Sequence, residues 1–304
     1  MKNYLSLVKF SHTIFELPFA MIGFFLGIYK VTQENLFYAV HTTNGFEILV
    51  LFFKTHWKLF LLVLACMVTA RNAAMAFNRY IDRKYDEKNP RTAIREIPSG
   101  IITTNNAIVF IVINCVLFIT ATYFINSLCF YLSPVALAVI LGYSLTKRFT
   151  FLCHLILGIG LGLAPIGAFL AVTGKFELLP ILFSFAVFFW VAGFDIIYAL
   201  QDEQFDKENN LYSIPSYFGQ NKAKWISRTL HICCMICLFT AGVYGNFISI
   251  YWLGFIVFTI LLFYQHFLVI NFGLEKIDLA FFTTNGVASI LFSLCVITEI
   301  IMHL

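Results

Sequence analysis

Two groups of acidic side chains are the residues of this sequence best suited to chemistry. In the first group, Asn78, Asp82 and Asp86 follow one another at intervals of four residues. Because an α-helix has about 3.6 residues per turn, this spacing places the three side chains on one helix face. Carboxylate and amide oxygens are hard ligands of the kind that Mg²⁺ prefers. The first group therefore predicts one half of a magnesium site.

The second group contains Asp195, Asp202 and Asp206, spaced by seven and then four residues. This spacing also predicts one stripe on a helix, with Tyr198 close to it. Asp195 directly follows the apolar run FSFAVFFWVAGF, which indicates a position at membrane depth. An ionisable side chain at that depth is costly and marks a functional site by default.

Basic residues flank both acidic groups. Mg²⁺ is commonly held by one or two carboxylates together with substrate phosphates and water, so two such helix ends could hold a diphosphate through two ions. The basic side chains would add charge-assisted hydrogen bonds to the phosphate oxygens. They are Arg79, Arg83, Lys84, Arg91, Arg95, Lys147 and Arg148. A solvated charged rim gives a similar composition, and the spacing by itself does not separate the two interpretations.

The composition predicts the solvent around these residues. Of 304 residues, 60% are hydrophobic and 12% are charged, against about 45–50% and about 25% in soluble domains. This balance indicates a chain embedded in a lipid bilayer. The net charge of +4 is small, and the basic residues form no separate module, so we expect no nucleic-acid partner.

Nine apolar stretches are long enough to span a bilayer as helices. They are approximately 13–31, 58–79, 106–126, 128–145, 152–172, 177–200, 227–245, 248–271 and 279–301. The chain reads as one domain, 1–304. Within the remaining stretch, 32–57, the segment FEILVLFF looks too short to span, and an interfacial position is open to it.

Lys and Arg residues predict the orientation. With a cytoplasmic N-terminus, the inner segments hold fifteen Lys and Arg and the outer segments hold four, as the positive-inside rule requires. We therefore expect a multi-pass protein of the inner (plasma) membrane with its C-terminus outside. Two substantial inner loops, 80–105 and 201–226, then bring both acidic groups to the cytoplasmic side.

The motifs resemble those of the UbiA superfamily of intramembrane prenyltransferases. The first group matches an NxxxDxxxD motif, and the second matches a DxxxD motif preceded by DxxY. Further similar segments are KFSHTIFELPFAMIGFFLG, NPRTAIREIPSG, LGYSLTKRFTFLCHLILGIGLGLAPIGAFLAVTG and SIPSYFG. The resemblance covers most of the chain, except for the 32–57 insertion and the last three helices.

Within that superfamily the sequence is most similar to the 4-hydroxybenzoate polyprenyltransferase-like branch, including members thought to serve menaquinone synthesis through the futalosine route. One residue departs from the pattern: Arg79 stands next to Asn78, where many hydroxybenzoate enzymes have an aspartate. The resemblance implies an all-α membrane protein with nine transmembrane helices in a ring around a central cavity. It also implies a lateral opening for the lipid tail and a cytoplasmic cap formed by the two inner loops.

The expected reaction transfers a polyprenyl group from polyprenyl diphosphate to an aromatic acceptor of the hydroxybenzoate or dihydroxynaphthoate type in quinone biosynthesis. The predicted catalytic residues are Asp82, Asp195, Asp202 and Arg71. One Mg²⁺ is assigned to Asn78, Asp82 and Asp86, and the other to Asp202 and Asp206. The metals and the basic residues would neutralise the departing diphosphate.

Two roles in the expected reaction stay open. The acceptor should carry a carboxylate, and Arg71 is predicted to pair with it beside Tyr198, or alternatively to bind the pyrophosphate. Asp195 or the nearby phosphate would take the proton of the acceptor.

Two alternative functions accompany this prediction. The first is a secondary transporter, in which Asp195 and Arg71 would form a proton or substrate relay. The second is a member of the same superfamily with another acceptor, such as haem, chlorophyllide or homogentisate, because the metal motifs separate these acceptors only weakly.

Overall fold

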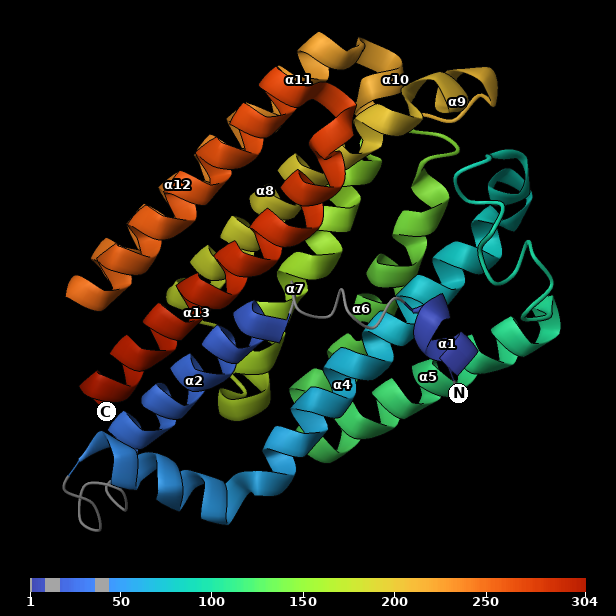
Figure 1. Ribbon diagram of the computed structural model, residues 1–304. Helices are drawn as coiled ribbons and strands as arrows, with labels where there is room; N and C mark the ends of the chain where they lie inside the picture. The colour runs from blue at the N-terminus through green and yellow to red at the C-terminus, as the bar shows by residue number, and fades with distance from the viewer. Residues whose placement is uncertain (1, 9–16, 36–43) are drawn as a thin grey trace.

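The computed structural model describes residues 2–8, 17–35 and 44–304, and in this part of the chain it is helical without strands. The long helices lie side by side, tilted in a common direction (Figure 1). Short helical turns, η2 (Leu200–Asp202), η3 (Gly273–Lys276) and η4 (Leu279–Thr283), join some of them. The helices are α1 (Lys2–Leu7), α2 (Leu17–Glu34), α4 (Gly45–Lys88), α5 (Thr104–Ile125), α6 (Ser127–Thr146), α7 (Cys153–Thr173), α8 (Leu178–Ala199), α9 (Glu203–Glu208), α10 (Ile214–Phe218), α11 (Gln220–Tyr244), α12 (Ser249–Phe272) and α13 (Thr284–His303).

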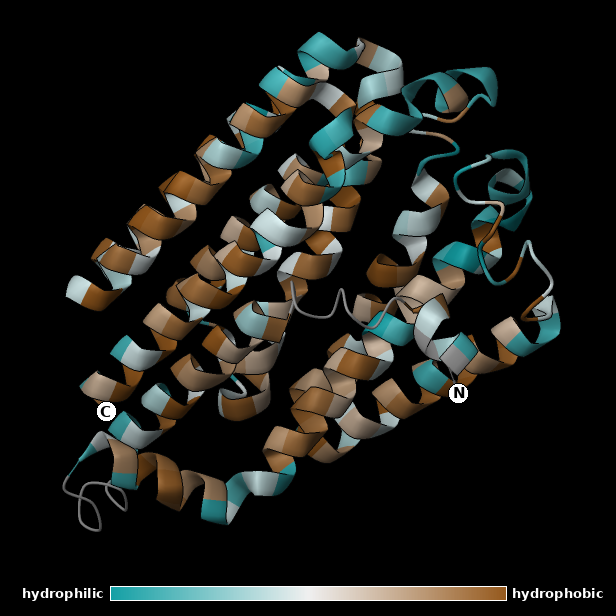
Figure 2. Cartoon of the chain, viewed as in Figure 1, coloured by the Kyte–Doolittle hydropathy of each residue, from teal (hydrophilic) through white to brown (hydrophobic). Residues whose placement is uncertain are grey.

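Eight helical segments within the described ranges are long and apolar enough to cross a membrane. They match the second to ninth predicted spans. The first predicted span, 13–31, corresponds to α2, and its residues 13–16 lie outside the described residues. Hydrophobic residues cover the long helices, while hydrophilic residues gather at their ends (Figure 2). The protein is therefore a multi-pass membrane protein.

Helix α4 is much longer than the predicted span 58–79. It begins at Gly45, where the Asn44 side chain accepts a hydrogen bond from the Glu47 N–H, and it ends at Lys88. A kink at His56 divides it (φ −122°, ψ 21°). The limb before the kink contains FEILVLFF, crosses one end of the bundle in Figure 1 and packs on α2. Its position in a membrane interface stays a prediction.

Small residues allow close contact between neighbouring helices, as is common where helices pack in lipid. A Cβ atom on Gly23 of α2 would lie 1.9 Å from the carbonyl oxygen of Pro165 in α7. A Cβ atom on Gly158 of α7 would lie 2.5 Å from the carbonyl oxygen of Phe188 in α8. These two glycines allow α2 to pack closely on α7, and α7 to pack closely on α8.

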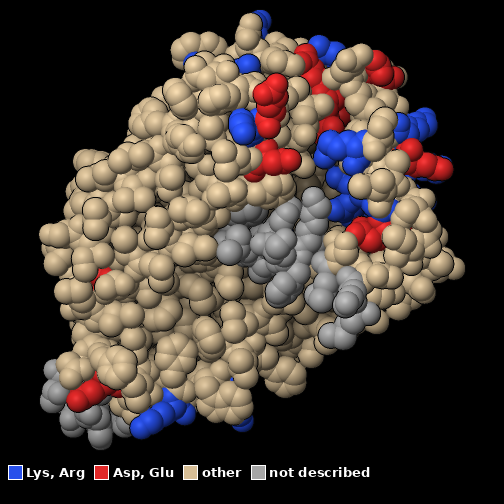
Figure 3. Space-filling view, viewed as in Figure 1, with Lys and Arg blue, Asp and Glu red and all other residues tan. Residues whose placement is uncertain are grey.

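Charged side chains gather at the end of the molecule where α9 and α10 lie (Figure 3). A smaller group of charged side chains lies at the opposite end of the molecule, near the C-terminal end of α13. Two polar connections contact each other at the charged end: residues 89–103, which follow α4, and the turns from η2 to α10. The first connection is anchored by Thr92, Ile97 and Ile102, which are buried. This end carries the predicted site.

Candidate active site

The first acidic group lies on a single helix, as its spacing predicted. Asn78, Asp82 and Asp86 all belong to α4, and Asn78 Nδ2 donates to Asp82 Oδ2 at 3.2 Å. The predicted inner loop 80–105 begins too early, because α4 continues through both aspartates to Lys88. The residues between them are charged but form helices well, which explains the longer helix.

The second acidic group does not lie on one continuous α-helix, which corrects the predicted stripe. Helix α8 ends at Ala199, a 3₁₀ turn covers Leu200–Asp202, and α9 begins at Glu203. The tighter turn has about three residues per turn, so it rotates Asp202 and Asp206 relative to Asp195.

Each aspartate of the two metal motifs is paired with a cation from another part of the chain. Arg148 Nη2 lies 2.9 Å from Asp82 Oδ1, and Arg95 Nη1 lies 2.7 Å from Asp86 Oδ1. Arg91 Nη2 donates to both carboxylate oxygens of Asp202, at 2.7 and 2.9 Å. These contacts have the geometry of strong charge-assisted hydrogen bonds.

Asp206 completes the set and is fully buried. Its Oδ1 lies 2.7 Å from Lys147 Nζ, and Ser213 Oγ donates to its Oδ2 at 2.9 Å. Burial lowers the pKa of Lys147, but the Asp206 carboxylate more than offsets this, so the pKa is raised and the ammonium group stays charged. The pKa of Arg91 is likewise lowered by burial but raised overall by Asp202.

The turn between α6 and α7 connects the two acidic groups. Lys147 contacts Asp206 of the second group, and the next residue, Arg148, contacts Asp82 of the first. Consecutive Cα atoms are about 3.8 Å apart, so one aspartate from each group approaches the same short piece of chain. Arg91 adds a second connection, from the segment after α4 to Asp202. The two groups therefore face one space.

The remaining predicted diphosphate ligands are placed differently. Arg79 is buried and lines the cavity described below, and its Nη1 has no hydrogen-bond partner within the described part of the chain. Arg83 donates to the carbonyl oxygen of Tyr80 and lies over the Tyr80 ring. Lys84 is exposed. The role of Arg83 and Lys84 in diphosphate binding gains no support from these positions.

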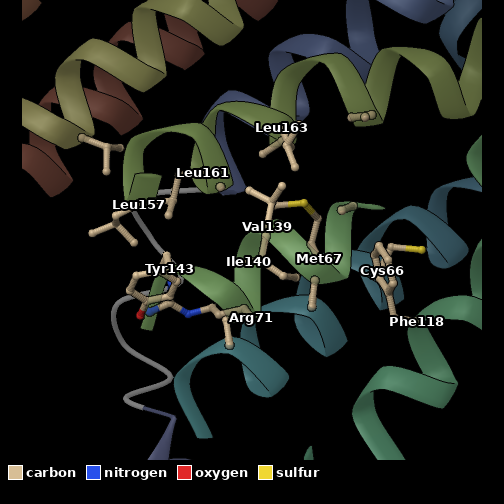
Figure 4. Close-up of a pocket in the computed structure, with 18 of the residues that line it drawn as sticks. Cys66, Met67, Arg71, Phe118, Val139, Ile140, Tyr143, Leu157, Leu161 and Leu163 are labelled. Carbon is tan, nitrogen blue, oxygen red and sulfur yellow. The ribbon is translucent and has the colours of Figure 1, made fainter. Parts of the chain in front are cut away.

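A cavity of about 560 Å³ leads inward from this charged end. Helices α4 to α8 supply most of its lining, which is largely apolar. Figure 4 shows Arg71 extending into the cavity from α4, with Tyr143 and Ile140 of α6 and Leu157 and Leu161 of α7 around it. The polar lining residues are Arg71, Asn78, Arg79, Arg95, Thr122, Ser133, Tyr143, Asp195 and Tyr198.

Aromatic side chains stand at the same end of the cavity. The rings of Tyr198 and Phe281 have centroids 4.2 Å apart, and Phe282 lies beside them. The Arg91 guanidinium carbon lies 5.7 Å from the Tyr198 ring centroid, and Arg91 Nη1 donates a hydrogen bond to the Tyr198 hydroxyl. The sequence had assigned no role to Phe281 or Phe282, because nothing in their neighbours distinguishes them from other Phe residues.

One residue of this site was missed altogether. His154, at the start of α7, is buried, and its Nδ1 lies 2.6 Å from Asp195 Oδ2. A histidine at the head of a long apolar segment was the available signal. Nothing in the sequence indicated that it contacts Asp195, which is 41 residues away.

The donor set suits a divalent cation of the Mg²⁺ type. The ligand atoms are carboxylate and amide oxygens, and the buried Oδ2 of Asp86 has no hydrogen-bond partner among the described residues. Across those residues no three His, Cys, Asp or Glu side chains converge on one point. An ion here would therefore need further oxygens, such as those of a phosphate, which is how Mg²⁺ is usually held.

Comparison with known proteins decides the family. The model of the UbiA prenyltransferase family matches residues 48–287. The chain belongs to this family. The UbiA-family chain is 31% identical over 280 residues to the 4-hydroxybenzoate octaprenyltransferase of Escherichia fergusonii, covering 87% of this chain and 96% of that protein. It is 28% identical over 235 residues to the protein of that name from Francisella tularensis, covering 77% and 81%.

Solved structures of UbiA homologues have the same fold as this chain. The apo structure of a UbiA homologue from Aeropyrum pernix superposes with a TM-score of 0.78 at 27% identity, covering 95% of this chain and 98% of that one. A UbiA homologue from Archaeoglobus fulgidus, bound to GPP and Mg²⁺, has a TM-score of 0.68 at 20% identity, covering 98% and 99%. This chain is therefore a membrane-embedded prenyltransferase of the UbiA family, and the transporter alternative is set aside.

Proposed function

We propose that this enzyme transfers a polyprenyl group from polyprenyl diphosphate to an aromatic acceptor of the hydroxybenzoate or dihydroxynaphthoate type, with Mg²⁺, in quinone biosynthesis. The proposal rests mainly on one observation. The two acidic groups, each paired with basic side chains, lie at one end of a largely apolar cavity. The charged end suits a diphosphate with its metal ions, and the apolar length suits a prenyl tail. The names of the curated relatives support a hydroxybenzoate acceptor over haem, chlorophyllide or homogentisate.

Diphosphate binding is assigned to the charged end. Asn78, Asp82 and Asp86 would hold one Mg²⁺, and Asp202 and Asp206 the other. Bound Mg²⁺ would supply positive charge that stabilises the diphosphate as it leaves. Arg91, Arg95, Lys147 and Arg148 are paired with these acids at 2.7–2.9 Å. Each would transfer hydrogen bonds from its aspartate to the phosphate oxygens.

The cavity lining controls the fate of the cation left after the C–O bond breaks. Apolar side chains exclude water that would otherwise capture an allylic cation. The faces of Tyr198, Phe281 and Phe282 lie near the same end and stabilise positive charge through their π-systems. The aromatic carbon ortho to the acceptor hydroxyl supplies the electron pair for the new C–C bond.

The acceptor is assigned to the space between Arg71 and Asp195, which both line the cavity. A planar guanidinium binds a carboxylate through two parallel hydrogen bonds, so Arg71 would orient a carboxylated ring. Asp195 would then receive the proton that the acceptor loses. We further propose that the helices form a nine-helix ring with a lateral opening, and that the two polar connections close over the diphosphate on the cytoplasmic side of the plasma membrane.

The test is a transfer assay with purified protein. The enzyme is incubated with a long-chain prenyl diphosphate and Mg²⁺, and 4-hydroxybenzoate and 1,4-dihydroxy-6-naphthoate are offered separately. We expect a prenylated product, detected by mass spectrometry, with one of the two acceptors and none in EDTA. Diphosphate release without either product would reject both acceptors, and product formation in EDTA would reject the metal.

A further inference from the structure

His154 connects the carboxylate of Asp195 to Ile214, the first residue of α10. Its side chain is 3% exposed. Nδ1 lies 2.6 Å from Asp195 Oδ2, and Nε2 accepts a hydrogen bond from the Ile214 backbone N–H at 3.3 Å. A single imidazole ring thus contacts two elements that are separate in the sequence.

The contact with Ile214 determines where the imidazole carries its proton. A ring nitrogen that accepts a hydrogen bond from an N–H group has no proton of its own. The proton of neutral His154 is therefore on Nδ1, which donates it to Asp195 Oδ2. This hydrogen bond fixes the plane of the Asp195 carboxylate, and the Asp195 side chain remains 24% exposed and lines the cavity.

The segment around Ile214 is itself fixed to the second acidic group. Ser213 and Ser216 form a capping box at the start of α10, and Ser213 Oγ donates to Asp206 Oδ2. Two adjacent residues, Ser213 and Ile214, therefore contact Asp206 and His154 respectively. The position of this segment is set by the same aspartate that is assigned to the metal.

We propose that His154 is a positioning residue that orients Asp195 to receive the acceptor proton and that connects Asp195 to the start of α10. The proposal rests on the proposed function, in which Asp195 faces the acceptor. In that step the C–O bond of the prenyl diphosphate breaks and diphosphate leaves with its electron pair. The ring carbon forms the C–C bond, and the proton passes to Asp195 and then to water.

Two amide substitutions separate the two contacts of His154. In His154→Asn, the side-chain NH₂ group stands near the place of Nδ1 and donates to Asp195, but it does not reach Ile214. In His154→Gln, the amide oxygen reaches the place of Nε2 and accepts from Ile214, while the donor to Asp195 is lost. His154→Ala removes both contacts.

We expect kcat for prenyl transfer to fall on the order of 10–100-fold in His154→Gln and His154→Ala, as for other supporting hydrogen-bond partners. His154→Asn should keep most of the activity. The KM for prenyl diphosphate should stay unchanged in His154→Gln, because the contact with the Ser213–Ile214 segment is kept. The melting temperature of each variant is measured in the same detergent.

Equal activity in the Asn and Gln variants would overturn the inference, and so would losses that follow the melting temperatures rather than the donor to Asp195. The wild-type enzyme is assayed first with both acceptors. Absence of a prenylated product at that stage would reject the proposed function and this inference together, whereas an active wild type with equally active variants rejects the inference alone.

Discussion

Asp82 and Asp202 come from different helical segments. Asp82 accepts a hydrogen bond from Arg148, and Asp202 accepts one from Arg91. We expect Asp82→Ala and Asp202→Ala each to abolish prenyl transfer, because each removes an oxygen ligand assigned to Mg²⁺. Insertion and purification should be normal. The measurement is product formation by mass spectrometry.

Matched controls for these two variants lie beside the site. Glu87 and Glu208 are exposed acidic residues close in sequence to the two groups. Glu87→Ala and Glu208→Ala should keep wild-type turnover. Retained turnover in Asp82→Ala or Asp202→Ala would reject the metal-site assignment.

The ion pair of Asp206 and Lys147 gives a stability prediction, because Asp206 is fully buried. Lys147→Met leaves an uncompensated buried carboxylate, which typically costs about 3–5 kcal/mol. A lower melting temperature is expected, with partial recovery in Lys147→Met/Asp206→Asn, where the amide still accepts from Ser213. An unchanged melting temperature in the single variant would show that the pair contributes little.

The sequence predicted which residues belong to the site better than it predicted which side chains contact one another there. Asn78, Asp82 and Asp86 could be placed on one face because helical periodicity is a local property. The pairing of Asp206 with Lys147 depends on packing between segments that are far apart in the sequence, and several other basic residues were equally eligible. For the same reason His154 was missed.

At the scale of helices, Gly23 controls the contact between α2 and α7. A methyl group in Gly23→Ala would lie 1.9 Å from a backbone oxygen of Pro165, so the helices must separate. We expect a lower melting temperature and reduced transfer. Gly142→Ala is the control, because its Cβ has no neighbouring atom within 4 Å, and helix propensity favours Ala over Gly by about 1 kcal/mol. Equal stability of the two variants would contradict this contact.

Helix ends were the least predictable part of the fold. Eight of the nine predicted spans match helices that are long and apolar enough to cross a membrane, because apolar length is a strong local signal. The limb of α4 before His56 was too short to identify as part of a longer helix, and its contact with α2 buries Ile48, Leu49 and Phe52. The 3₁₀ turn at Leu200–Asp202 has no separate sequence signal, since its residues also suit an α-helix.

At the scale of the whole molecule, the charged site and the C-terminus lie at opposite ends (Figures 1 and 3). With the site on the cytoplasmic side, the C-terminus should face outward. Green fluorescent protein fused after Leu304 should therefore be dark in bacterial cells, and alkaline phosphatase at the same position should be active. The reverse pattern would contradict the proposed orientation.

The four ion pairs at the charged end also have a consequence for the order of events. Asp82, Asp86, Asp202 and Asp206 each face one cation, so the four pairs carry no net charge. A bare diphosphate would bring several negative charges next to pairs that are already neutral. A diphosphate already complexed with divalent ions would exchange partners with these pairs at little electrostatic cost. Under the proposed function, substrate and metal are therefore expected to arrive as one complex, and the released diphosphate to depart with its ions.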